Sequence, residues 1–162
     1  MVATPVNRGE KFSALDGTAL VFVPVVAAGN GVPTRAEINA GTDLTTEVES
    51  WEGWTTEAAT IGTPSLARFV GNIPGRITIT PGVLQMYADR GQDDVRDILP
   101  VGTTGAMVFM DSGDVPGNKM DVWPIRVNML AKVRSMEAAT LLRIAFTHNQ
   151  LPVEDAVIPA AS

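Results

Sequence analysis

The chain has 162 residues, enough for one domain with a sizeable core, and its 12 Lys and Arg against 18 Asp and Glu give a formal net charge of -6. With 45% hydrophobic and 19% charged residues it is too apolar for a disordered protein, and the lack of cysteine excludes disulfides and thiolate metal sites. The acidic balance argues against a nucleic-acid-binding protein, which normally carries a basic surface.

The N-terminal segment carries no recognisable targeting signal. Residues 1–17 lack the apolar stretch behind a basic start that defines a signal peptide. The longest apolar run, Ala19–Ala28, has ten residues and contains Pro24, whereas a membrane-spanning helix needs about 20. We therefore expect a soluble protein, made in a cytoplasm, that forms a single domain over residues 1–162 with residues 1–17 as an extended arm.

The composition predicts a mainly β domain of short strands, because Val, Ile and Thr supply over a quarter of the residues and Gly and Pro recur between the apolar runs. Leu20–Val26 is apolar on both faces, and so is Ala106–Met110. Such a strand is buried on both sides. Two explanations stay open: its outer face lies under a helix of the same chain, or it meets another subunit.

Few segments predict helix. Pro33–Asn39 predicts a short one, with proline near its start and Gly41 just beyond its end. Gln92–Leu99 resembles a second helix, since acidic residues open it and Pro100 stops it. Between these two segments lies Ile61–Gly75, which contains glycine and proline and which we expect to be a long loop between strands.

The later part of the chain alternates apolar and polar residues. Arg76–Thr80 and Ile125–Arg134 follow this pattern of half-buried strands, and Leu142–Thr147 resumes it, so the last two segments predict a hairpin. The final segment, Gln150–Ser162, contains two prolines and four large apolar residues. We expect it to be an arm that grips a neighbouring subunit.

One acidic window accounts for the whole net charge. No Lys or Arg lies between Arg35 and Arg68, and the six acids there equal the formal charge because the other acids balance the bases. A charge run is usually a solvated face, but this window is rich in threonine and tryptophan, and exposed strands usually mix charges. A surface of one sign, repeated by symmetry, creates a large field. The six acids are Glu37, Asp43, Glu47, Glu49, Glu52 and Glu57.

No residue pattern supports catalysis, so we predict a protein that is not an enzyme and uses no metal or cofactor. The single histidine, His148, has no cysteine or second histidine with which to form a site, and we interpret it as a strand-end residue. Asp111–Gly113 follows an apolar strand as in an aspartic protease, but no later supporting segment is found. The acids of Asp111–Asp114 and Asp89–Asp94 fit turns rather than calcium loops. The chain has neither a serine-hydrolase elbow nor a phosphate loop.

Eight segments carry a family resemblance that covers about residues 20–160. They are Val21–Pro24, Pro33–Leu44, Thr63–Phe69, Ile73–Arg76, Asp94–Gly105, Met110–Asp114, Lys119–Pro124 and Ile158–Ala160. In this order they resemble the major tail tube proteins of long-tailed (siphovirus-type) bacteriophages, especially those that infect actinobacteria.

The resemblance implies a tail-tube-type β-sandwich or barrel with one short flanking helix, extended N- and C-terminal arms and a long loop, residues 61–75, that reaches the next ring. Subunits of that family form rings, usually hexameric, which stack into a hollow tube through which DNA is ejected. The implied partners are further copies of the chain, a tape measure protein and a tail terminator, in a virion tail assembled in the host cytoplasm. Genomic DNA passes through without specific binding, and no membrane is involved.

For such a tube the acidic window predicts an acidic lumen, because duplex DNA carries about one charge per 1.7 Å of its axis and is repelled by an acidic wall. Glu47 and Glu49 share a face by strand alternation, whereas Glu52 and Glu57 are included only because they lie in the window. We expect contacts between subunits or rings at Phe22, Arg68, Phe69, Ile73, Val153, Val157 and Ile158.

A second hypothesis is a binding module. A monomeric β-sandwich could present the neighbouring Trp51 and Trp54 to a ligand, such as a carbohydrate.

Overall fold

A computed structural model describes residues 3, 9, 11–15, 17–91 and 94–161, and it confirms a mainly β fold with one short helix. In chain order the elements are β1 (Ala19–Val23), α1 (Arg35–Asn39), β2 (Thr42–Asp43), β3 (Val48–Glu52), β4 (Thr55–Thr63), β5 (Gly71–Thr80), β6 (Val83–Tyr87), β7 (Thr104–Met110), β8 (Lys119–Val133), β9 (Leu141–Thr147) and β10 (Val153–Val157). The N-terminal arm expected over residues 1–17 lies largely outside the described residues.

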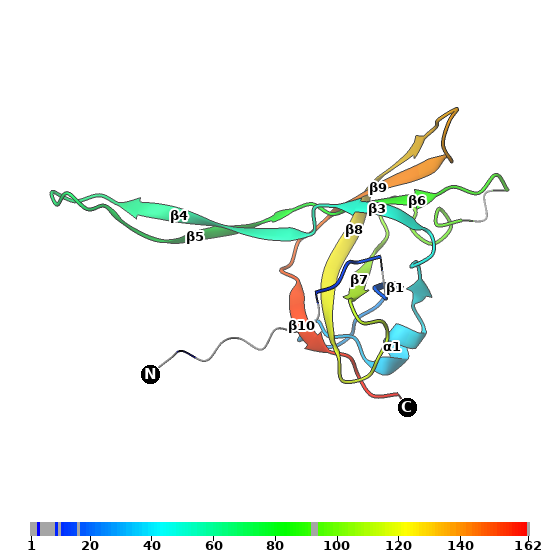
Figure 1. Cartoon of the computed structure of the whole chain (residues 1–162), viewed down its shortest axis with the longest axis horizontal. Helices are drawn as coiled ribbons and strands as arrows, with labels where there is room; N and C mark the ends of the chain where they lie inside the picture. The colour runs from blue at the N-terminus through cyan, green and yellow to red at the C-terminus, as the bar shows by residue number, and fades with distance from the viewer. Residues whose placement is uncertain (1–2, 4–8, 10, 16, 92–93, 162) are drawn as a thin grey trace.

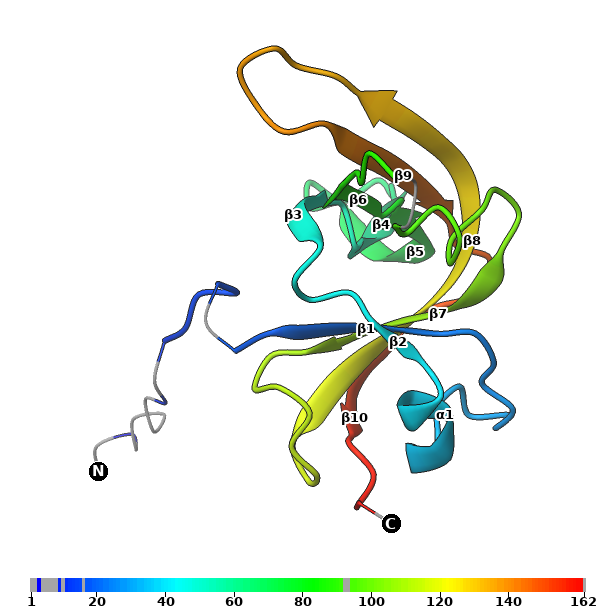
Figure 2. The same cartoon turned by 90° about the vertical axis from the view of Figure 1, so that its right-hand side faces the viewer.

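Eight strands form one antiparallel sheet in the order β2-β1-β7-β8-β9-β6-β3, with β10 added beside β8. The 15-residue β8 pairs with β7 and β10 through its first half and with β9 through its second, and a bulge between Val127 and Met129 lies at the change of partner. Figure 2 shows β8 curving from one layer into the other. The sheet therefore folds over itself as an open sandwich, not a closed barrel.

Apolar side chains fill the space between the two layers. Trp54, which follows β3, lies among several aromatic rings: its ring centroid is 5.1 Å from that of Phe109, 5.7 Å from Trp123 and 5.4 Å from Phe146. Gly82 lies directly against the Trp54 indole, where any Cβ would collide with the ring. This packing fixes the place where the chain leaves the body to form β4 and where it returns from β5.

The outer face of β1 and β7 is covered by the same chain. Val21 and Val108 on these strands pack with Ile38 of α1 and with Ile158 beyond β10, all of them buried. The first explanation for the doubly apolar strands, burial under a helix, is therefore confirmed, and contact with another subunit is wrong for this face.

The helix α1 forms because its N-terminus is capped. Thr34 accepts a hydrogen bond from the Glu37 backbone N–H, and Glu37 in turn accepts one from the Thr34 N–H, a capping box. The backbone N–H groups of Thr34 and Ala27, which donate to the Glu37 carboxylate, hold the pKa of Glu37 below its usual value. From the first turn of α1, Arg35 donates two hydrogen bonds to Asp114 and one to the Pro159 carbonyl.

The C-terminal segment differs from the expected arm on a neighbouring subunit, because it packs on its own chain. β10 pairs with the first half of β8, and Ile158, 1% exposed, packs beneath it in the subunit's own core. Pro152 and Pro159 flank the strand instead of lying in it, so neither removes a backbone donor that the pairing needs.

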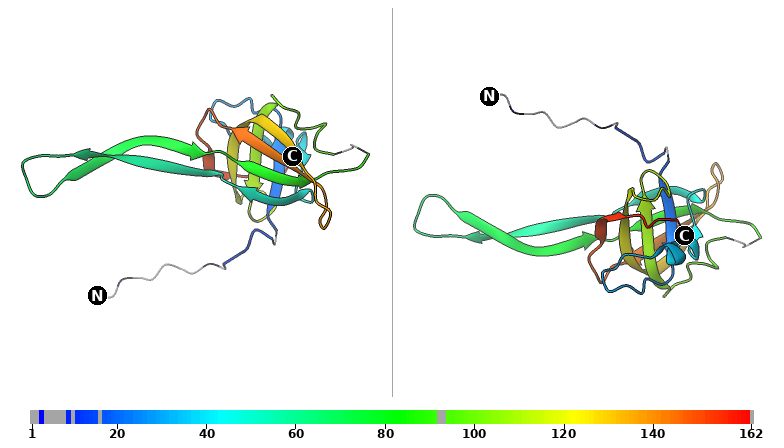
Figure 3. Two further views of the ribbon diagram at one scale, coloured as in Figure 1. Left: turned by 90° about the horizontal axis from the view of Figure 1, so that it is seen from above. Right: turned by 90° about the horizontal axis from the view of Figure 1, so that it is seen from below.

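Two further expectations change. Of the helix predicted over 92–99, residues 92 and 93 lie outside the described residues, and 94–99 form successive turns rather than an α-helix. Asp94 accepts hydrogen bonds there from the backbone N–H groups of Asp89 and Arg96. The loop expected over 61–75 is mostly strand, because β4 and β5 extend into it and leave only residues 64–70 as a loop. These two strands form a long twisted ribbon that projects from the body (Figures 1 and 3).

The strands predicted over 76–80 and 125–134 and the hairpin to 147 are confirmed in β5, β8 and β9. Across the described residues, no helix is long and apolar enough to cross a membrane.

Candidate assembly surfaces

The β4–β5 hairpin is exposed on both faces. Every residue of β4 is exposed and no residue of β5 is buried, although the ribbon carries several large apolar side chains. An isolated two-stranded hairpin is at best marginally stable in water. Large exposed apolar surface of this kind marks a contact with another molecule. The most exposed are Ile61 (53%), Leu66 (109%), Phe69 (81%), Val70 (52%), Ile73 (51%) and Ile77 (55%).

The apolar side chains change face along the ribbon. Ala58 pairs with Ile77, and three residues further along β4 Ile61 pairs with Ile73. Since side chains alternate along a strand, these two pairs lie on opposite faces. A bulge in β5 between the two pairs keeps the strands in register across the change. The hairpin thus presents a proximal apolar patch on one face and a distal patch on the other.

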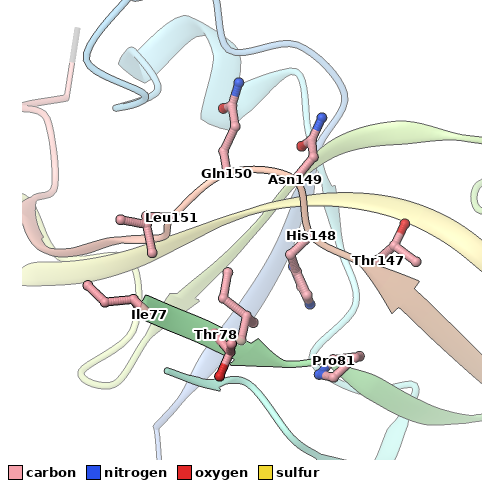
Figure 4. Close-up of a pocket in the computed structure, with 9 residues that line it drawn as sticks. Ile77, Thr78, Pro81, Thr147, His148, Asn149, Gln150 and Leu151 are labelled. Atoms are coloured by element: carbon pink, nitrogen blue, oxygen red, sulfur yellow. The ribbon is translucent and has the colours of Figure 1, made fainter. Parts of the chain in front are cut away.

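A groove of about 440 Å³ opens between the proximal patch and the 147–151 connection (Figure 4). Ile77 and Leu151, both 55% exposed, lie on its two sides. At its base the Nε2 of His148 accepts a hydrogen bond from the Gly82 N–H at 3.0 Å, so its Nδ1 carries the proton and donates to the Pro124 carbonyl at 2.9 Å. Burial lowers the pKa of His148, which favours this neutral form. His148 holds the end of β9, as its position in the sequence suggested.

A second free surface is the open face of the four strands β3, β6, β9 and β8. The register places Glu52, Val83, Ala145 and Met129 in one row across this face, opposite the core. Arg143 of β9 reaches Glu52 at 3.6 Å, and both side chains are partly exposed. Met129 is 42% exposed and Glu52 is exposed, so part of this face is accessible to another molecule.

The four acids proposed for a lumen wall lie in three places. Glu52 is on the open face beside Arg143, and Glu57 is on the projecting hairpin. Glu47 precedes β3, and Glu49 occupies the bulge of that strand, so the simple alternation that gave them a shared face does not apply. Their position on a lumen wall stays a prediction.

The expected contact residues also divide. Arg68, Phe69 and Ile73 lie exposed at the distal end of the hairpin, and Val157 is 58% exposed on β10. Val153, only partly buried, packs against the core beneath α1.

The predicted contacts at Phe22 and Ile158 are wrong, because these side chains are only 3% and 1% exposed and lie inside the subunit. Each fills the core of its own chain, so its side chain offers no surface to a neighbour.

The binding-module hypothesis loses its paired tryptophans. Trp54 is 9% exposed and belongs to the core, whereas Trp51 is 39% exposed and meets Phe109 edge-on. Asp111 lies in the turn after β7, and burial together with the nearby Asp121 raises its pKa. In the described part of the chain no group of acids and histidine is arranged to hold a metal ion.

Sequence reasoning missed two features of these surfaces. The first is the length of the hairpin. Its glycines and proline predicted a loop, but most of the segment forms two strands that pair with each other. The second is a cluster of bases near the end of β8, drawn from segments about 40 residues apart in the chain, and no local pattern brings those segments together.

An open sandwich that carries a projecting ribbon with exposed apolar side chains on both faces is suited to assembly with other subunits. The family profile described as phage tail tube protein matches residues 7–161. The chain therefore belongs to the phage tail tube protein family, whose members are structural components of the virion tail that self-assemble into a tube. No curated protein matches the chain.

Proposed function

We propose that copies of this chain join side by side into rings, six to a ring, and that the rings stack into a tube that conducts DNA into the host cell. The β4–β5 hairpin is the observation that carries this proposal. Its two apolar patches face opposite ways, so the hairpin can pack between two neighbouring copies. A simple dimer would need only one such patch. Head-to-tail contacts of this kind extend into open filaments.

The open face of β3, β6, β9 and β8 is our candidate for the wall of the channel. Arg143 lies on a central strand of this face, where an unpaired cation would hold DNA phosphates. Glu52 lies beside it and offsets that charge. In this form the acidic-lumen proposal rests on Glu52, which keeps the wall from binding the DNA that passes along it.

The wider proposal places the tube in a long-tailed phage of actinobacteria and assembles it in the host cytoplasm. A tape measure protein would fill the tube before ejection, and a terminator would close its end. The family resemblance supports these partners. If rings stack through the exposed hairpin, stacking continues until another protein, such as the terminator, closes the end of the tube.

Assembly of the purified chain tests the proposal. Size-exclusion chromatography followed by negative-stain electron microscopy should show rings and stacked tubes at micromolar concentration. A species of 17.1 kDa at every concentration would overturn it.

The wall is tested on the assembled tubes. We expect tubes of the wild-type chain to retain no short duplex DNA at moderate salt, whereas Glu52→Lys tubes, which place two cations together, retain it. DNA retention by wild-type tubes would contradict the proposed wall.

A further inference from the structure

The β4–β5 hairpin joins the body at two points of its backbone. The chain leaves the body through Gly53 and Trp54 and returns through Pro81 and Gly82. At the first point both residues have positive φ, 75° and 61°, and Trp54 is buried in the core. At the second point the Pro81 carbonyl lies where any Cβ on Gly53 would collide with it. The two points pack tightly on each other, and together they set the direction in which the hairpin leaves the body.

His148 binds the second of these points. Its Nε2 accepts the hydrogen bond from the buried Gly82 N–H, and its Nδ1 donates to the Pro124 carbonyl of β8. The Gly82 carbonyl accepts a further hydrogen bond from the Phe146 N–H at 2.9 Å. Figure 4 shows the imidazole extending from the 147–151 connection toward the chain at Pro81. The ring therefore bridges the root of the hairpin to β8.

Two tryptophans hold the ring in this position. The centroid of the imidazole lies 5.3 Å from that of Trp54 and 5.6 Å from that of Trp123, and both contacts are edge-on. Trp123 lies on β8, and Trp54 lies where the chain leaves for the hairpin. One side chain thus contacts the outgoing chain, the returning chain and β8, which are the three segments that meet at the root.

A small rotation at the root moves the far end of the hairpin a long way. The nine residues of β4 span about 30 Å at about 3.3 Å per residue. A rotation of about 10° at the root displaces the end of such a ribbon by about 5 Å, roughly the spacing between two neighbouring strands. The distal apolar patch then meets a different part of any neighbouring copy.

Protonation of the ring removes its bond to the root. The neutral ring accepts at Nε2 because Nδ1 carries the proton, whereas a protonated imidazole donates from both nitrogens and accepts at neither. The buried Gly82 N–H then faces a second N–H and loses its acceptor. The bond to the Pro124 carbonyl persists, since Nδ1 donates in both forms. Protonation therefore frees the hairpin root while His148 stays attached to β8.

Among the described residues, no charged side chain besides that of His148 lines the groove around the ring. The nearest charges along the hairpin are Glu57 and Arg76, and those along β8 are Asp121 and Arg126; all four lie outside the groove lining. Burial is the main influence on the ring, and it lowers the pKa of His148 below its ordinary value of 6.5. The ring is therefore neutral at neutral pH and gains its proton in mild acid.

We propose that His148 positions the hairpin for assembly, and that a proton on its ring releases the hairpin. The hairpin angle belongs to the single subunit, whereas its effect on association rests on the proposed function. Neutral conditions then favour tubes, and mildly acidic conditions favour separate subunits whose hairpins are free to swing.

The chain suits a direct test because it has one histidine and no cysteine. NMR of the single imidazole reports its protonation. Thr60→Cys on β4 and Lys119→Cys on β8, both at exposed positions, take spin labels whose separation reports the hairpin angle. In monomers held below the assembly concentration, we expect a narrow distance distribution at about pH 7.5 and one at least about twice as broad once the ring is protonated.

Two substitutions separate the hydrogen bond from the charge. His148→Phe keeps a ring between the tryptophans but accepts no hydrogen bond, so its distribution should be broad at every pH and assembly should need at least about fivefold more protein. His148→Gln has a neutral acceptor for the Gly82 N–H and does not titrate, so its hairpin angle and its assembly should not change in mild acid. Asn149→Ala, which lines the same groove, is the matched control and should keep the wild-type angle, pH response and assembly.

The positioning role fails if the ring gains its proton while the distances stay narrow, or if His148→Phe keeps the wild-type angle at neutral pH. A pH response that persists in His148→Gln assigns the release to another group, and a ring that stays neutral until the chain unfolds rejects release by a proton. An angle that responds while the assembly concentration stays constant rejects the control of association. Failure of the wild-type chain to form any ring is a separate outcome, which rejects the proposed function and leaves the monomer measurements valid.

Discussion

In the body of the molecule, β1 and β7 are covered on both faces by other parts of the chain, whereas β4 and β5 are exposed on both faces except near the body, where Ile79 packs against the core. Both regions contain strands rich in apolar and β-branched residues. In the body those residues pack on the opposite layer, on α1 and on the C-terminal segment. In the hairpin the same kinds of residues face solvent, at exposures above 50% for Ile61, Ile73 and Ile77.

This difference shows how one chain separates folding from assembly. The body holds the apolar contacts that stabilise a single subunit, since burial of apolar area is the main favourable contribution to folding. The hairpin holds apolar area that the subunit itself leaves exposed and that another molecule can bury. Substitutions should therefore fall into two classes: those in the body change the free energy of unfolding of the monomer, and those in the distal hairpin change only association.

The largest loss of monomer stability is expected at the junction of the two regions. Trp54→Ala removes a side chain that contacts Phe109, Trp123, Phe146 and His148, and it should lower the unfolding free energy by about 3–5 kcal/mol. Chemical denaturation at a concentration below assembly measures it.

Trp51→Ala is the control for this change, because Trp51 is 39% exposed and packs on one ring. Its cost should stay near 1 kcal/mol, the usual size for a partly exposed position. Equal losses in the two variants would contradict the assignment of Trp54 to the core.

The clamp on the C-terminal segment should have the next largest effect. Arg35→Ala removes the fork that holds Asp114 and the Pro159 carbonyl, and it should cost about 2 kcal/mol, as hydrogen bonds to charged groups do. Hydrogen exchange should quicken most in β10. Arg76→Ala, on the exposed hairpin, should change monomer stability by less than about 0.5 kcal/mol, and an equal loss there would refute the clamp.

Acid should weaken the body through Asp94. The hydrogen bonds from Arg96 lower the pKa of Asp94 to about 2, below its value in the unfolded chain. The folded state therefore favours the ionised form, and a stabilisation of roughly 2 kcal/mol is present above about pH 4 and is lost as the pH falls toward 2. The difference in unfolding free energy between the wild type and Asp94→Asn, measured from pH 5 to 2, should shrink through this window. A constant difference would contradict it.

Local patterns predicted much of the body. The period of two in β8 and β9 and the proline and glycine around α1 are signals that each segment carries by itself. The C-terminal segment was interpreted as an arm because of its prolines. The sequence does not show that one side of β8 is free to pair with this segment. Phe22 and Ile158 were assigned to subunit contacts for a related reason. An apolar residue is expected to be buried, but the sequence does not show whether its own chain or another chain buries it.

The assembly surfaces were harder to predict because they depend on how distant segments meet. Arg68, Phe69 and Ile73 were identified as exposed contact candidates, but the ribbon that carries them was not. Lys132 and Arg134 lie near Arg90 only because β6 and β9 are neighbours in the sheet. The acidic window was visible as a run, yet the bulge at Glu49 and the turn at Trp54 distribute its acids over an edge, a face and the hairpin.

The smallest change in monomer stability, with a large change in assembly, is expected at the hairpin tip. Leu66 and Phe69 are 109% and 81% exposed, so Leu66→Ser/Phe69→Ser removes no buried side chain from the subunit and should leave the unfolding free energy within about 0.5 kcal/mol of the wild type. If the tip inserts into a neighbouring copy, the same variant loses a buried apolar anchor, which at an interface costs on the order of 2 kcal/mol or more and raises the assembly concentration at least about tenfold.

Sedimentation and negative-stain microscopy would measure that concentration for the tip variant and for Val115→Ser, which replaces a 48% exposed apolar residue in the turn between β7 and β8. The Val115 variant should assemble normally, because we expect stacking to depend on the hairpin tip and not on exposed apolar side chains elsewhere on the surface. If both variants assemble like the wild type, the hairpin is not the stacking element, and its exposed side chains must be buried by a partner other than this chain. If the tip variant instead unfolds more easily, the separation between folding in the body and association in the hairpin fails.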